Sequence, residues 1–132
     1  MPAGYEQGEP LDNYDAVLLA VKAMTDGRRF ALRGERVTVS TVGVVPRMRQ
    51  LLADAPLVCL ALSLHAPTQE LRTKIVPTAR AWPLDKLMEA IDERLAAGHR
   101  VMMEYVVIGN VNDSHECAHQ LGALLQGKRV LL

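Results

Sequence analysis

Residues 37–62 read VTVSTVGVVPRMRQLLADAPLVCLAL, and no other part of the chain says more about its fold. The segment opens with a β-branched run at 37–40, enters a helical segment at Pro46 that reaches Ala53, and closes with the apolar run 57–62. An apolar run this short, without polar alternation, is typical of a parallel strand that is covered on both faces. The segment therefore predicts a strand, a helix and a second strand in succession.

The same alternation continues on both sides of this unit. Upstream, apolar residues spaced three and four apart predict an amphipathic helix over 11–24, which Gly27 ends. Downstream, the pattern predicts a helix over 69–74, a helix from Pro83 to Gly98, a strand over 101–108, a helix opened by the D-x-x-E capping box at Asp113, and a strand over 130–132.

Strands that alternate with helices through right-handed crossovers form a parallel sheet or part of a (β/α) barrel. The predicted fold class is therefore α/β. Taken as a complete domain, this series of elements would leave sheet edges unpaired, which native sheets normally avoid. We therefore expect the chain to be a piece of a larger barrel, cut at both ends.

The composition narrows the class of protein. The chain has 132 residues, 49% of them hydrophobic, which is enough for one domain with one core. Fifteen basic and fifteen acidic residues cancel, so net charge gives no electrostatic case for nucleic acid, and DNA is not an expected partner. No stretch approaches the roughly 20 apolar residues that span a membrane, and the N-terminus has no secretion signal. We expect a cytoplasmic protein that binds no membrane, with Cys59 and Cys117 reduced.

Polar residues occur where predicted strands end, and ligands gather at such places in α/β folds. Gly8 and Glu9 offer a close backbone approach and a carboxylate suited to an ammonium group, although an ordinary turn before a helix explains them too. Ser40 to Gly43 offer hydroxyls to a polar ligand, and helix capping is an equally good explanation.

Histidines and basic residues are further candidates. His65 follows the apolar strand and is either a ligand contact or a loop residue bonded to backbone. His115 and His119 share a helical face, but no third ligand stands at a suitable spacing, so we expect no metal site. The third loop carries a group of basic residues that we interpret as a solvated rim rather than a phosphate site: Arg72, Lys74 and Arg80.

Five blocks in order carry a resemblance to a known family: GEPLDNYDAVLLAV (8–21), RVTVSTVGVVP (36–46), LALSLHAP (60–67) with ELRTKIVP (70–77), EYVVIGNVND (104–113) and AHQLGALL (118–125). They resemble the radical S-adenosylmethionine RNA methyltransferases, which methylate carbon 2 of adenine in 23S rRNA and tRNA. The resemblance covers residues 8–132 as a partial radical SAM core domain and leaves 1–7 unmatched. It implies a partial (β/α)6 barrel, S-adenosylmethionine and a [4Fe-4S] cluster.

The resemblance also implies roles for individual residues. Gly8 and Glu9 match the motif that grips the methionine end of S-adenosylmethionine, with the glutamate facing its ammonium group. Other positions match residues that bind or line the same cofactor: Ser40, Ser63, Leu64 and His65.

The cluster motif Cys-x-x-x-Cys-x-x-Cys does not occur in the sequence, and three thiolates hold such a cluster. No catalytic residue and no metal ligand is therefore assigned here. We expect a fragment of the methyltransferase that is inactive alone, and whether the chain is itself an enzyme stays open. The alternative is a non-catalytic truncated paralogue that serves as a binding or interaction module.

Overall fold

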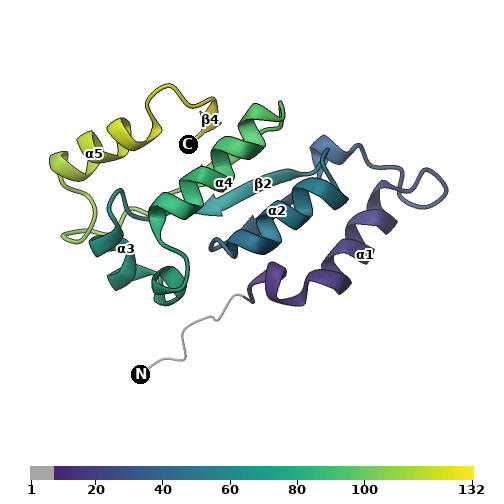
Figure 1. Cartoon of the computed structure of the whole chain (residues 1–132), viewed down its shortest axis with the longest axis horizontal. Helices are drawn as coiled ribbons and strands as arrows, with labels where there is room; N and C mark the ends of the chain where they lie inside the picture. The colour runs from purple at the N-terminus through teal and green to yellow at the C-terminus, as the bar shows by residue number, and fades with distance from the viewer. Residues whose placement is uncertain (1–7) are drawn as a thin grey trace.

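The computed structural model describes residues 8–132, so the unmatched segment 1–7 lies outside the described residues. The elements, shown in Figure 1, are η1 (Pro10–Asn13), α1 (Tyr14–Thr25), η2 (Gly34–Arg36), β1 (Thr38–Thr41), α2 (Val45–Asp54), β2 (Cys59–Ser63), α3 (Gln69–Ile75), η3 (Pro77–Arg80), α4 (Leu84–Ala96), β3 (Val101–Glu104), α5 (His115–Leu125) and β4 (Val130–Leu131).

The strands form one parallel sheet of four in the order β1-β2-β3-β4. This confirms the predicted α/β fold with parallel (β/α) repeats. Each strand lies beside its predecessor in the chain, so the sheet advances in one direction without reversal, as the wall of a (β/α) barrel does. All strands therefore present their carboxyl ends at the same edge.

The two faces of the sheet differ in polarity because side chains alternate along each strand. Helices α2 and α4 contact each other and lie over one face, in front of β2 in Figure 1. That face is buried and mostly apolar, with Val39, Thr41, Leu60, Leu62, Val101 and Met103. The opposite face, which we call the inner face, carries the alternating residues Ser40, Ala61, Ser63, Met102 and Glu104.

Gly43 allows the loop after β1 to pass close to α4. Its φ is +109°, and a Cβ atom there would lie 2.4 Å from Cδ2 of Leu87. The backbone N–H of Gly43 also donates to Oγ1 of the buried Thr41 at 3.0 Å. Glycine is thus required for both conformation and space.

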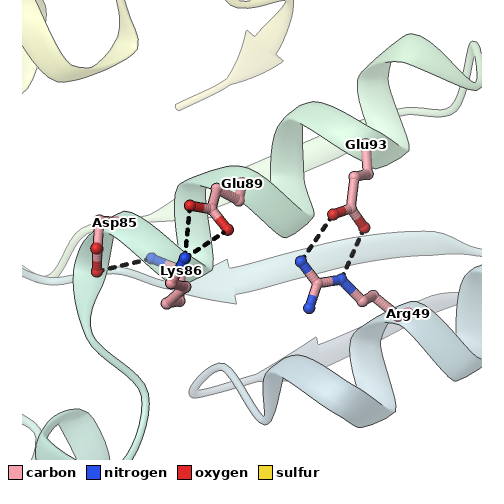
Figure 2. A network of polar contacts seen from close by, with 5 residues as sticks. All are labelled: Arg49, Asp85, Lys86, Glu89 and Glu93. Carbon is pink, nitrogen blue, oxygen red and sulfur yellow. Dashed lines mark hydrogen bonds and ion pairs between the residues drawn. The ribbon is translucent and has the colours of Figure 1, made fainter.

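An ion pair links the two covering helices on the outside (Figure 2). The guanidinium of Arg49 on α2 donates to both carboxylate oxygens of Glu93 on α4, at 2.8 and 2.7 Å. The bond lowers the pKa of the Glu93 carboxyl. Because both side chains are almost half exposed, at 43% and 46%, solvent screens the pair, and apolar packing dominates the contact between α2 and α4.

Helix α1 is fastened to α2 through Tyr14. The phenol donates to Oδ2 of Asp54 at 2.7 Å, and the Arg47 guanidinium lies over the ring at 5.2 Å from its centroid. Burial, together with the bond to Asp54, raises the pKa of Tyr14. This attachment fixes the start of α1, and with it the preceding Glu9, against the sheet.

The structure corrects two predicted boundaries. Strand β3 ends at Glu104 rather than continuing to residue 108, because residues 105–112 form a loop whose backbone bonds to the side chain of Asn112. Helix α5 is capped by Ser114, whose Oγ accepts from the N–H of Cys117 at 3.1 Å, and not by Asp113. Across residues 8–132, every helix is too short or too polar to cross a bilayer.

Candidate functional site

Glu9 lies at the carboxyl end of β1. Its Oε1 accepts from the N–H of Leu11 at 2.9 Å, which caps η1, and its Oε2 accepts from the N–H of Val42 at 2.8 Å. Each oxygen keeps a free lone pair, so the carboxylate remains able to accept from a ligand. Gly8, before it, is exposed, and a Cβ atom there would meet nothing within 4 Å.

Ser40 and Ser63 are brought together by a residue that the sequence did not single out. The hydroxyls of Ser40 and Ser63 both donate to Oε2 of Glu104, at 2.9 and 3.1 Å. Glu104 is the last residue of β3 and pairs in register with Ser63. We call these three residues, on neighbouring strands of the inner face, the acceptor cluster. A polar residue at the end of a strand, in register with Ser63, was the signal that sequence reasoning missed.

Leu64 is fully buried, so its side chain belongs to the core. Its N–H donates to the carbonyl of Glu104 at 3.0 Å, and its carbonyl accepts from Arg72. The role of Leu64 in the site is therefore to hold the chain between Ser63 and His65.

His65 has a positive φ of +58°, and its ring is bonded to the loop after β3. Its Nδ1 accepts from the N–H of Val106 at 3.1 Å. Burial is the main reason that the pKa of His65 is lowered. The bond assigns the neutral tautomer, in which Nε2 carries the proton and can donate to a ligand.

Asn112 fastens the 105–112 loop and is 2% exposed. Its Nδ2 donates to the carbonyls of His65 and Val106, each at 2.8 Å, and its Oδ1 accepts from the N–H of Ile108 at 2.6 Å. The sequence offered only a helix-start explanation for this segment. Asn112 instead holds the loop against His65.

Arg72 is fully buried, which corrects its predicted place in a solvated basic rim. Its Nε donates to the carbonyl of Leu64 at 3.1 Å, and its Nη2 donates to the carbonyls of Val42 and Ser63 at 2.6 and 3.2 Å. Burial lowers the pKa of Arg72 to about 10. The guanidinium ties the ends of β1 and β2 together under the site. Lys74 and Arg80 are exposed, as the rim interpretation predicted.

Comparison with known proteins identifies the class. Residues 5–121 match the family described as the Radical SAM superfamily. The chain therefore belongs to the radical SAM superfamily, and the resemblance found in the sequence is confirmed.

Within this superfamily, the chain is similar to proteins named as RNA methyltransferases. It is 47% identical over 124 residues to the dual-specificity RNA methyltransferase RlmN of Alcanivorax borkumensis, covering 91% of this chain and 32% of that protein. It is 47% identical over 121 residues to a probable dual-specificity RNA methyltransferase RlmN of Symbiobacterium thermophilum, covering 91% and 33%. The chain thus spans about a third of the length of these curated relatives.

A solved structure agrees. The crystal structure of a radical SAM methyltransferase from Sphaerobacter thermophilus matches with a TM-score of 0.89 and 39% sequence identity, over 93% of this chain and 36% of that one. The predicted radical SAM fold is confirmed by this match.

The residues present fit one of the two cofactors that the superfamily implies and not the other. Carboxylate and serine oxygens at the strand ends suit S-adenosylmethionine, which offers an ammonium group and ribose hydroxyls. The chain's two cysteines, Cys59 in β2 and Cys117 in α5, are fewer than the three thiolates of a [4Fe-4S] cluster. Within residues 8–132, no group of three or more His, Cys, Asp or Glu side chains is placed to hold a metal.

Proposed function

We propose that residues 8–132 form part of the S-adenosylmethionine site of a cytoplasmic methyltransferase that modifies carbon 2 of adenine in 23S rRNA and tRNA. The [4Fe-4S] cluster and the methyl-carrying cysteine of the family belong to segments other than this one. The observation that supports the proposal most is the position of Glu9. Its carboxylate is fixed at the carboxyl end of β1, the edge where (β/α) folds bind ligands.

Each residue of the site has a proposed task. Glu9 accepts hydrogen bonds from the ammonium group of S-adenosylmethionine. Ser40 and Ser63 present their oxygens on the inner face, and His65 offers its Nε2 proton beside them. When bound, S-adenosylmethionine supplies the methyl group and, together with the cluster, the radical chemistry of the superfamily. The protein's contribution is to bind, orient and exclude water.

Arg72 and Asn112 support these residues from below and from the side. Arg72 fixes the carbonyls of Val42 and Ser63, and Asn112 fixes the carbonyl of His65. A displacement of about 1 Å in a site costs much of its catalytic power, so residues that hold the backbone matter as much as those that touch the ligand.

A segment exchange tests the proposal. The matching segment of the Alcanivorax borkumensis enzyme is replaced by residues 8–132, and RNA treated with the exchanged protein is digested and analysed by mass spectrometry. We expect 2-methyladenosine, in amounts that fall when Glu9→Gln is introduced into the same protein. The unmodified Alcanivorax enzyme is the positive control, and cluster content and circular dichroism establish that the exchanged protein is folded and loaded.

A folded, cluster-loaded exchanged protein that forms no 2-methyladenosine would overturn the proposal. That result would favour a binding or interaction module without radical chemistry. The cysteine content of the chain is the observation that keeps this second function in view, because it provides too few thiolates for a cluster.

A further inference from the structure

The proton arrangement of the acceptor cluster is determined by its hydrogen bonds. A serine hydroxyl has one proton, and both hydroxyl protons, of Ser40 and Ser63, are donated to Oε2 of Glu104. A carboxylate has no proton to return. The serine oxygens are therefore left with lone pairs only.

The cluster as a whole can then accept hydrogen bonds but cannot donate them. Among residues 8–132, no side chain or backbone N–H bonds to Oε1 of Glu104. Ser40, Ser63 and Glu104 are all half-buried on the inner face, so this oxygen and the two serine oxygens form one polar patch. A ligand group that fits such a patch must bring several donors of its own.

We propose that Glu104 is a positioning residue that turns both serine hydroxyls into acceptors, so that the acceptor cluster binds the paired hydroxyls of a ribose. The inference rests on the proposed S-adenosylmethionine site. Glu9 is assigned to the ammonium group at the end of β1, which leaves the ribose diol as the donor pair for the acceptor cluster. Carboxylates at the ends of parallel strands bind ribose hydroxyls in other nucleotide folds.

The Glu104→Gln variant distinguishes this role from a merely structural one. The glutamine amide keeps the shape of the side chain but donates from its nitrogen, so at least one serine loses its proton acceptor and the pattern of donors and acceptors is mixed. Glu116→Gln is the matched control, because Glu116 is exposed on α5 and its neutralisation changes the charge equally.

The test measures binding of two probes to the 132-residue chain by calorimetry: S-adenosylmethionine and its 2′-deoxyribose analogue. We expect the wild-type chain to bind the analogue about tenfold or more weakly, since a hydrogen bond to a charged group is lost. Glu104→Gln should weaken S-adenosylmethionine binding by a similar factor and abolish the discrimination between the two probes. Ser63→Ala should reduce the discrimination as well and serves if Glu104→Gln does not fold.

Failure of this inference differs from failure of the proposed function. If the wild-type chain binds both probes equally, or if Glu104→Gln discriminates as the wild type does, the role of Glu104 is overturned and the cofactor site stands. If the folded wild-type chain binds neither probe, the site itself is overturned and the role of Glu104 falls with it.

Discussion

Glu9 combines two tasks that one carboxylate is able to perform. It satisfies the N–H groups of Leu11 and Val42, which would otherwise lack partners at a helix start and a strand end, and it keeps lone pairs for a ligand. The turn explanation and the ligand explanation that the sequence left open are therefore compatible. The capping bonds hold the carboxylate in place before a ligand arrives.

The His65 ring offers a prediction about pH. Because burial lowers its pKa, the unfolded chain binds a proton more readily than the folded chain. The contribution of neutral His65 to stability is complete above about pH 6.5 and is lost as the pH falls through the lower pKa of the folded state. Protonation would also replace the lone pair that accepts from Val106.

We expect an NMR titration of the His65 ring to give a pKa below that of the same ring in the urea-unfolded chain, and the Val106 amide resonance to shift over the same pH interval. An equal or higher pKa in the folded chain would contradict this account of the ring.

At the scale of elements, the loop between β1 and α2 depends on Gly43. We expect Gly43→Ala to destabilise the chain by about 1–3 kcal/mol, because alanine at positive φ is strained. The added methyl group would also collide with Leu87. Urea unfolding followed by circular dichroism measures the change.

Gly122→Ala is the matched control, since Gly122 lies exposed in α5 with nothing within 4 Å of an added Cβ atom. The control is expected to be neutral or to stabilise by up to about 1 kcal/mol. Equal effects of the two substitutions would show that the loop does not require glycine.

The junction of β1, β2 and α3 depends on Arg72. Arg72→Met removes the donor to three carbonyl oxygens, and we expect a loss of about 3 kcal/mol or more in the free energy of unfolding. Arg72→Lys should recover part of this loss because one ammonium group reaches fewer of the carbonyls.

Arg80→Met changes an exposed arginine of the same region and should alter stability by less than about 0.5 kcal/mol. If Arg72→Met proved as mild as Arg80→Met in urea unfolding, the interpretation of Arg72 as the tie between the strand ends would be wrong.

At the scale of the whole molecule, the order of strands and helices was predictable because it rests on periodicity. The apolar run at 57–62 and the β-branched run at 37–40 announce β2 and β1, and the structure moves their bounds by only a few residues. The parallel arrangement followed from the alternation with helices.

The supporting residues of the site were not predictable from that pattern. The burial of Arg72 depends on carbonyls that come together only when β1 and β2 pair, and the role of Glu104 depends on strand register. The end of β3 was missed because an apolar stretch, VVI at 106–108, continues past it in the sequence while its backbone is taken up by Asn112. Long-range contacts of this kind leave no local signal.

The central claim is that these 125 described residues, 8–132, contain a formed S-adenosylmethionine site anchored by Glu9. Calorimetric titration of S-adenosylmethionine into the 132-residue chain, its Glu9→Gln variant and an Asp12→Asn control tests it most directly. We predict binding to the wild type and the control, weakened roughly tenfold or more in Glu9→Gln. A folded wild-type chain that binds no S-adenosylmethionine, or a Glu9→Gln variant that binds as tightly as the wild type, would contradict the claim.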